Sequence, residues 1–201
     1  MIITNSTKRI KQQEEKIDQL YSRIDKLMNK ITDEGNDMTK KMMSFAENAN
    51  KIQIQLYHLL QIFGAERVSI YEFHNGGKNL AGVEFKKCSN TYEAVSLETK
   101  PIIKEMQNLP LSINPLWSQV LTTRDEIDIP SVQNVDDKFL KSYLEIQSIK
   151  SYYSTILQDY DNAPIGFITL EYYTVSRQLL ESDLENFNEI AIKIAVLINI
   201  K

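Results

Sequence analysis

The sequence contains few of the residue types that would point to particular classes of protein. Cys88 is the one cysteine among 201 residues, so no disulfide can form within a chain and no thiolate cluster can bind a metal. Only two histidines are present, and we expect no metal site. The chain has 23 lysines and arginines against 27 acidic residues and no basic tract, which argues against a nucleic-acid-binding protein.

Long apolar runs are also missing. No segment approaches the roughly 18 consecutive apolar residues of a membrane-spanning helix, and residues 1–16 lack the apolar centre of a secretory signal peptide. We therefore expect a cytoplasmic protein with no membrane segment in this chain. Hydrophobic residues make up 42% of the sequence, enough for an ordinary buried core.

Residues 7–34 contain no proline or glycine and repeat isoleucine every seven positions, with leucine three positions after two of the isoleucines. This arrangement favours a parallel two-stranded coiled coil, and hence a homodimer. The alternative is a helix packed on its own domain, but so narrow an apolar seam suits a partner helix better. The predicted dimer interface consists of Ile10, Ile17, Leu20, Ile24, Leu27 and Ile31.

Gly35 interrupts this pattern. Beyond it, apolar residues from Met38 to Phe63 continue at alternating spacings of four and three, but their phase is shifted as if four residues had been inserted. We expect a break near Gly35, either as a discontinuity in one long helix or as a division into two helices, and so a coiled-coil segment at residues 1–46 followed by a domain at residues 47–201. Gly64 is expected to cap the helix that precedes it.

From residue 66 the apolar period changes from that of a helix to that of a strand. Asn114 followed by Pro115 is a strong helix start. The order of elements predicts an α+β domain in which helices pack on an antiparallel sheet. Strands are expected at 67–73, 83–96, 149–160 and 164–174, with a short one in 124–132, and further helices around 102–106, at 136–147 and over 182–200.

Three segments together resemble a GAF domain, the PAS-like sensory fold with a six-stranded antiparallel sheet. They are GAERVSIYEFH after a helix, PLWSQVLTTRDEIDIPSVQNVD, and the closing hairpin and helix from IKSYYSTILQDY onward. The resemblance covers roughly residues 47–201. The FHNGG motif at residues 73–77 is also similar to GAF-like proteins encoded by phages and bacteria.

This resemblance implies a pocket between the sheet and its connecting loops, which the family uses for cyclic nucleotides, tetrapyrroles, or amino or keto acids, or leaves empty. It also implies dimers formed through terminal helices and a mostly non-catalytic role. The sequence lacks the Asn-Lys-Phe-Asp-Glu set of the cyclic-nucleotide subset. Cys88 lies in the expected second strand rather than where a bilin would attach, so the cofactor stays unassigned.

The segment YEFHNGGKNLAG, residues 71–82, gathers Gly76, Gly77 and Gly82 and allows several interpretations. A phosphate cradle would need a helix to follow, and a strand is expected instead. A catalytic His74 would need a nucleophile and an orienting carboxylate, and no such motif supports it. The glycines suit a hairpin turn, while His74 and Asn75 remain candidates for a pocket mouth.

The sequence supports two functional hypotheses, and we predict no catalytic residue and no enzyme. The first is a dimeric GAF-like signalling module that senses or sequesters a small molecule and regulates a partner. The second is a phage-borne structural or protein-interaction module without a ligand. The candidate ligand-binding residues are His74, Asn75, Tyr92, Trp117, Tyr153 and Glu171.

Overall fold

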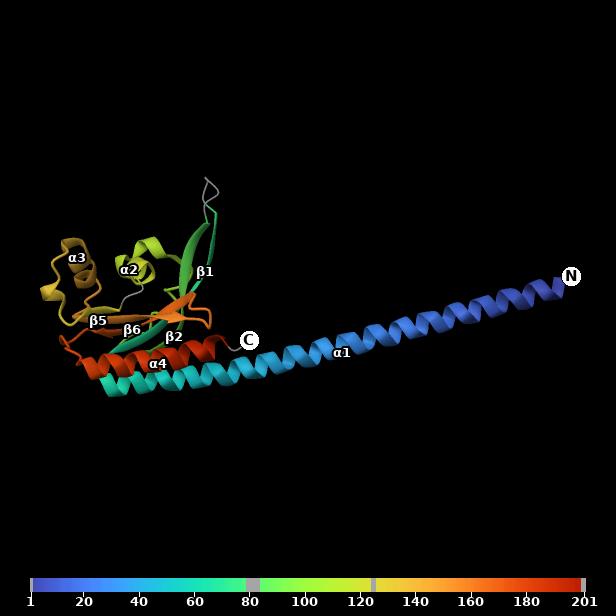
Figure 1. Ribbon diagram of the computed structural model, residues 1–201, viewed down its shortest axis with the longest axis horizontal. Coiled ribbons are helices and arrows are strands. Elements are labelled where there is room, and N and C mark those ends of the chain that lie inside the picture. The colour runs from blue at the N-terminus through green and yellow to red at the C-terminus, as the bar shows by residue number, and fades with distance from the viewer. Residues whose placement is uncertain (1, 79–83, 124–125, 200–201) are drawn as a thin grey trace. The chain divides into compact units, whose positions relative to one another are not determined.

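The computed structural model describes residues 2–78, 84–123 and 126–199, with side chains for all of these except residues 2–21, 36, 75–78, 84 and 85. The chain divides into two units, residues 1–47 and 48–201. The first is entirely helical, and the second contains the sheet and every other helix (Figure 1).

Helix α1 runs from Ile2 to Phe63 as one helix, so of the two alternatives at Gly35 the division into two helices is wrong. The helical hydrogen bonding continues past Gly35, whose carbonyl also accepts from the Thr39 hydroxyl at 2.9 Å. A glycine inside a helix costs only about 1 kcal/mol relative to alanine, and the many flanking helical residues outweigh that cost. The helix ends where predicted, with Gly64 in the left-handed conformation (φ 62°).

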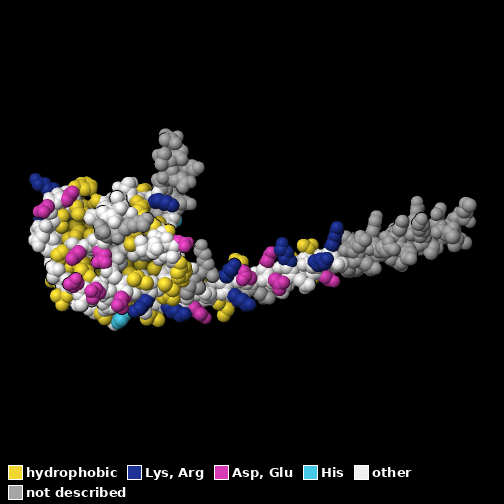
Figure 2. Space-filling model, in the orientation of Figure 1, with side chains coloured by type: hydrophobic (Ala, Val, Ile, Leu, Met, Phe, Trp, Pro, Cys, Tyr) yellow, Lys and Arg dark blue, Asp and Glu magenta, His cyan; other side chains and the backbone are white. Residues whose placement is uncertain are grey.

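Apolar side chains are exposed along the helical unit. Ile24, Leu27 and Ile31 are 49%, 60% and 67% exposed in the single chain. Figure 2 shows apolar side chains among charged ones along the described part of this helix. Ile10, Ile17 and Leu20 lie outside the residues whose side chains are described. The coiled coil therefore stays a prediction.

Six antiparallel strands form one sheet in the order β3-β2-β1-β6-β5-β4. Their bounds are β1 Arg67–Lys78, β2 Glu84–Val95, β3 Leu109–Pro110, β4 Ile127–Ile129, β5 Ser151–Gln158 and β6 Pro164–Tyr172. Gly166 allows β6 to approach β1 closely, since a Cβ there would lie 2.2 Å from the Tyr71 carbonyl oxygen. This is the predicted fold class, an antiparallel GAF-like sheet flanked by helices.

One face of the sheet is covered by residues 48–63 of α1 and by α4 (Glu181–Asn199), which lie side by side (Figure 1). The Asn48 side chain donates to the Leu197 carbonyl at 3.3 Å between these helices. Apolar burial stabilises this layer. Its buried residues include Ile52, Leu56, Leu59, Val68, Ile70, Tyr153, Ile168, Leu170, Tyr172, Phe187, Ile190 and Ile194.

The other face is covered by α2 (Pro115–Thr123), α3 (Lys138–Ile146) and the connecting segments (Figure 1). The Asn114 side chain caps α2 by accepting from the Leu116 N–H at 2.9 Å, as the Asn-Pro start predicts. Asp137 caps α3 in the same way, through the Leu140 N–H at 2.9 Å. The buried residues of this second core include Tyr71, Cys88, Leu116, Trp117, Val120, Ile127, Val132, Leu144, Tyr152 and Phe167.

Two local predictions are wrong. Residues 102–106 form one hydrogen-bonded turn rather than a helix, because their backbone is held by the sheet instead: the Met106 carbonyl accepts from the Asn90 N–H at 2.8 Å. Strand β1 also continues beyond His74 to Lys78, so Gly76 and Gly77 lie in a strand rather than in a turn. They coincide with an irregularity in the pairing to β2, where glycine is favoured. Gly82 lies outside the described residues.

None of the described helices is long and apolar enough to cross a lipid bilayer. Within the described part of the chain, no group of three or more His, Cys, Asp and Glu side chains is placed to hold a metal ion.

Candidate functional site

Polar side chains form rows across the sheet face that α2 and α3 cover. Side chains alternate between the two faces along a strand, so residues two apart point the same way. In the first row, Arg67 on β1 is paired with Glu171 on β6, which is paired with Tyr152 on β5. All three are buried. The next row consists of Ser69, Thr169 and Ser154, also buried.

Arg67 lies at the centre of a buried ion cluster. Its Nε lies 3.1 Å from Oε1 of Glu93, and its Nη1 lies 3.1 Å from Oε2 of Glu171. The exposed fractions of the Arg67, Glu93 and Glu171 side chains are 8%, 3% and 8%. Burial of the guanidinium opposes its charge, but the attraction of Glu171, Tyr173 and Glu93 outweighs burial and raises the pKa of Arg67.

Tyr173, just after β6, completes this cluster. Its hydroxyl accepts a hydrogen bond from Nη1 of Arg67 and donates one to Oε2 of Glu171. The guanidinium carbon of Arg67 lies 5.0 Å from the centre of the Tyr173 ring, within the range of a cation–π interaction. Arg67, Glu93, Glu171 and Tyr173 are referred to below as the Arg67 cluster.

The Arg67 cluster also holds the segment that follows β2. Nη2 of Arg67 donates to the Lys100 carbonyl at 2.8 Å. The Glu93 carboxylate accepts from the backbone N–H groups of Ile102 and Ile103, at 3.0 and 3.1 Å. The position of this segment over the sheet therefore depends on the charges of the cluster.

An inner cavity of about 200 Å³ lies between the polar rows and the elements above them. Its polar groups come from the sheet and from α2 and α3, and its apolar wall includes the Trp117 indole. The ring of Trp117 lies 5.1 Å from that of Tyr71, which stacks on Phe167 at 4.9 Å. The lining residues are Arg67, Tyr71, Ile102, Met106, Asn114, Leu116, Trp117, Tyr143, Gln147, Ile149, Tyr152, Glu171 and Tyr173.

Four tyrosine hydroxyls around this cavity are held in their neutral form. Burial raises the pKa of Tyr71, Tyr143, Tyr152 and Tyr173, and the negative charge of Glu171 raises it further. The Tyr152 hydroxyl makes no hydrogen bond of regular geometry with a described residue, although the Ser154 hydroxyl interacts with it. Neutral hydroxyls can donate as well as accept, so this wall can bind polar groups of either kind.

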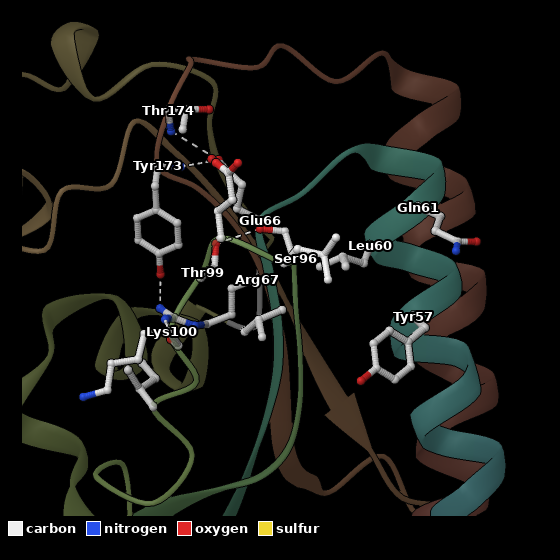
Figure 3. Close-up of a pocket in the computed structure, with 14 residues that line it drawn as sticks. Tyr57, Leu60, Gln61, Glu66, Arg67, Ser96, Thr99, Lys100, Tyr173 and Thr174 are labelled. Carbon is white, nitrogen blue, oxygen red and sulfur yellow. Dashed lines mark hydrogen bonds between the residues drawn. The ribbon is translucent and has the colours of Figure 1, made fainter.

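A larger and more open groove of about 990 Å³ adjoins the inner cavity, and Arg67, Ile102 and Tyr173 line both. Figure 3 shows Tyr57, Leu60 and Gln61 of α1 on one side of this outer groove, with the Arg67 and Tyr173 side chains on the other. The Arg67 cluster thus separates the inner cavity from the outer groove.

Trp117 and Glu171, two of the six predicted ligand-binding residues, line the inner cavity. Tyr153 belongs to the core on the opposite face, where its hydroxyl donates to the Arg177 carbonyl at 2.5 Å. Tyr92 packs against the same opposite core.

His74 and Asn75 follow the Arg67 row along β1. The Nε2 atom of His74 lies 2.9 Å from the Ser89 hydroxyl, which also accepts from the Asn108 N–H at 2.9 Å. His74 lines neither the cavity nor the groove. The Asn75 side chain lies outside the described side chains.

Sequence reasoning did not select Arg67 or Glu93. The signal was present, because Arg67 and Ser69 on β1, and Thr169 and Glu171 on β6, are polar residues at alternating positions in otherwise apolar strands. A buried strand face with a polar period of two indicates a site on that face. Glu93 could not be assigned to it from sequence, because an irregularity in the pairing between β1 and β2 sets its register.

Comparison with known proteins places this geometry in a family. The sequence model of the GAF domain matches residues 52–198. No curated protein sequence shows significant similarity to the chain.

Several solved structures share the fold. The GAF domain region of a putative membrane protein from Geobacter sulfurreducens has a TM-score of 0.60 and 13% identity, over 81% of this chain and 99% of that one. A phycocyanobilin-bound GAF domain from a cyanobacterial phytochrome has a TM-score of 0.58 and 20% identity, over 81% and 90%. GAF3 from Slr1393 of Synechocystis, in its photoproduct state, has a TM-score of 0.56 and 12% identity, over 75% and 92%.

Proposed function

The chain belongs to the GAF domain family, and from that premise we propose that it is a homodimeric sensor that binds a small molecule in the inner cavity and regulates a partner protein. GAF domains are typically sensory or ligand-binding rather than catalytic, which agrees with a binding role. We propose that this chain likewise catalyses no reaction.

The observation that carries this proposal is the polar lining of the inner cavity. Burying charged and hydroxyl groups costs stability unless each is hydrogen-bonded or paired. A domain that needed only a core would place apolar side chains on both faces of its sheet. This domain does so on the face that α1 and α4 cover. Arg67, Glu171 and Tyr152 instead face a cavity, which is the usual form of a ligand site.

A bilin does not fit this site. The volume of about 200 Å³ lies below the roughly 300–1,000 Å³ of pockets for drug-sized ligands, and a tetrapyrrole is larger than such ligands. Cys88 is fully buried in the core under α2, where burial raises the pKa of its thiol to about 12, and it lines neither the cavity nor the groove. The single cysteine is therefore not placed to hold a chromophore, and we propose a smaller ligand.

Ligand binding would reach the rest of the domain through the Arg67 cluster. This cluster both lines the cavity and holds residues 100–103 by their backbone. A ligand that competes for Glu171 would change the balance of charges around Arg67, and so the hold on that segment. We propose that this shift is what a partner protein detects.

Native mass spectrometry of the purified full chain tests ligand binding. We expect a retained small molecule, or a set of metabolites that raises the melting temperature of the unliganded protein in a concentration-dependent way. A bare polypeptide mass together with no stabilisation by millimolar metabolites would contradict the proposal.

That negative outcome would favour the second hypothesis, a protein-interaction module without a ligand. The observation on its side is that Arg67, Glu93, Glu171 and Tyr173 already bind one another. A phage origin stays a prediction from the FHNGG resemblance.

The dimer is proposed to form through the parallel coiled coil. Its support is the exposure of Ile24, Leu27 and Ile31 in the single chain, since an apolar seam on a long helix is stabilised by a partner helix. Replacing both Ile24 and Ile31 with Asn should give a monomeric mass in analytical ultracentrifugation. The matched control replaces Lys26 and Asp33, at outer heptad positions, with Asn and should stay dimeric. An unchanged mass in the Ile24/Ile31 variant would refute the coiled-coil interface.

A further inference from the structure

The charges of the Arg67 cluster do not balance. The Arg67 cluster contains one cation, Arg67, and two carboxylates, Glu93 and Glu171, which leaves one negative charge in excess. Arg67 and Glu171 are the charged residues that line the cavity in the described part of the chain. Of the two carboxylates, Glu171 faces the space that a ligand would fill, whereas Glu93 does not line it.

Arg67 is held mainly by its own cluster. Its Nη1 donates to Glu171 and to the Tyr173 hydroxyl, and its Nη2 donates to the Lys100 carbonyl. Its Nε forms an ion pair with Glu93 but makes no hydrogen bond of regular geometry within the described residues. An anionic ligand would thus compete with Glu171 and the Tyr173 hydroxyl for Nη1 and with the Lys100 carbonyl for Nη2, and it would be repelled by Glu171. The site is poorly suited to a carboxylate or a phosphate.

Glu171 has a carboxylate oxygen that can accept a further hydrogen bond. Its Oε2 accepts from Arg67 and Tyr173, whereas the one hydrogen bond to its Oε1 from a described residue is that of the Thr169 hydroxyl, which is long at 3.4 Å. The residue is 6% exposed and lines the cavity. A carboxylate oxygen can accept two hydrogen bonds, so Oε1 has room for a donor from a ligand.

Tyr152 offers a second acceptor beside it. It is the cross-strand neighbour of Glu171, and it is buried. Its hydroxyl has no hydrogen bond of regular geometry within the described residues. Neighbouring side chains on paired strands have their Cβ atoms roughly 5 Å apart, and both of these residues line the cavity.

The aromatic walls favour positive charge as well. Trp117, Tyr71 and Tyr143 line the cavity, and the faces of such rings attract cations, tryptophan most strongly. The negative charge of Glu171 acts on the whole wall, since it contributes to the raised pKa of Tyr71, Tyr143 and Tyr152 after burial itself. The charge of Glu171 and the aromatic composition of the wall thus favour the same sign of ligand charge.

We propose that the inner cavity binds a compact organic cation, a primary ammonium on a short apolar body, whose N–H groups donate to Oε1 of Glu171 and to the Tyr152 hydroxyl. The apolar body would lie against Trp117, Leu116 and Met106. This inference rests on the proposed function and specifies the ligand class of the same site. The cavity volume of about 200 Å³ restricts the ligand to a small molecule.

The position of Trp117 provides a local measurement, because it is the single tryptophan of the chain and it lines the cavity. Three probes of one shape separate charge from size: isobutylammonium, isobutanol and isovalerate, which are cationic, neutral and anionic at neutral pH. We expect isobutylammonium to change the Trp117 fluorescence in a saturable way and to raise the melting temperature. Isobutanol should bind roughly tenfold more weakly or worse, and isovalerate should have no effect.

Two variants, each of which removes one negative charge, test where the cation binds. Glu171→Gln should weaken isobutylammonium binding by roughly tenfold or more, while Glu98→Gln, an exposed residue of the outer groove, should leave it unchanged. Equal binding of the three probes to the wild-type chain would overturn the inference, as would preferred binding of isovalerate. The wild-type comparison decides the matter even where Glu171→Gln fails to fold.

The outcome also separates this inference from the proposed function. If native mass spectrometry shows a retained anionic or neutral molecule, the domain is a ligand-binding module and the cationic class is wrong. If no molecule is retained and none of the three probes changes the fluorescence of Trp117 or the melting temperature, both the inference and the proposed function fail.

Discussion

The two faces of the sheet are built from the same strands but in different ways. Toward α1 and α4, strands β1, β5 and β6 present Val68, Ile70, Tyr153, Ile168 and Leu170, which form a continuous apolar core. Toward α2, the residues between them on the same strands include an ion cluster and a row of hydroxyls. The alternation of strand side chains thus lets one segment of sequence serve two purposes.

This difference separates stability from function. The apolar face needs nothing further, because burial of hydrocarbon is favourable by itself. The polar face is stable only while its charges and hydroxyls remain paired, and some of its oxygen atoms have no regular partner. Natural proteins keep such groups where binding requires them. We therefore expect substitutions to behave differently on the two faces.

The largest effect is expected for Arg67→Met. The substitution keeps a long apolar side chain but leaves Glu93 and Glu171 buried without their cation, and the free energy of unfolding should fall by about 3–5 kcal/mol. Denaturant unfolding measures this change. Lys100→Met is the control, since the Lys100 side chain is exposed and forms an ion pair with the exposed Glu105; it should change stability by less than about 0.5 kcal/mol. Similar losses in the two variants would show that the Arg67 cluster does not stabilise the polar face.

A smaller effect is expected for a matched pair of neighbouring tyrosines on β5, which point to opposite faces. The Tyr153 hydroxyl donates to the Arg177 carbonyl and accepts from the Leu179 N–H, so Tyr153→Phe should cost about 0.5–1.5 kcal/mol. The Tyr152 hydroxyl makes no regular hydrogen bond with any residue that the structure describes, so Tyr152→Phe should leave stability unchanged or raise it slightly while weakening ligand binding.

The contribution of Tyr152 to the free energy of unfolding depends on pH. Burial and the charge of Glu171 raise the pKa of Tyr152 in the folded state above its value of about 10 in the unfolded state. Neutral Tyr152 therefore makes its full contribution to the free energy of unfolding below about pH 10. This contribution is lost as the pH rises above that value, because the unfolded state releases the tyrosine proton more easily than the folded state does. Tyr152→Phe should then gain stability relative to the wild type above about pH 10. A constant difference across this range would show that Tyr152 ionises equally well in both states.

Local signals in the sequence predicted much of the fold. Asn114-Pro115 marked the start of α2, and Gly64 marked the end of α1, because capping depends on a few adjacent residues. The predictions failed where distant contacts decide. Residues 102–106 form a turn because β2 and Glu93 hold their backbone, and the pairing of β1 with β2 extends past Gly76 and Gly77.

The candidate site was predictable only in part. Trp117 and Glu171 are unusual residues in their segments and could be selected from sequence. Their neighbours Arg67 and Glu93 are 26 residues apart in sequence and meet because of strand register, which a single sequence does not contain. Tyr152 and Tyr153 could not be told apart, because the face that each occupies depends on the packing of the whole domain.

The short connection between α1 and β1 has a mechanical consequence. Only Gly64, Ala65 and Glu66 separate the last residue of α1 from Arg67, a contour length of about 10 Å for three extended residues. Both ends of this tether are fixed, because the Tyr172 hydroxyl donates to the Phe63 carbonyl and the Tyr173 N–H donates to the Glu66 carboxylate. Because so few residues lie between them, a displacement of the Arg67 backbone would be passed to the end of α1 instead of being absorbed by a loop.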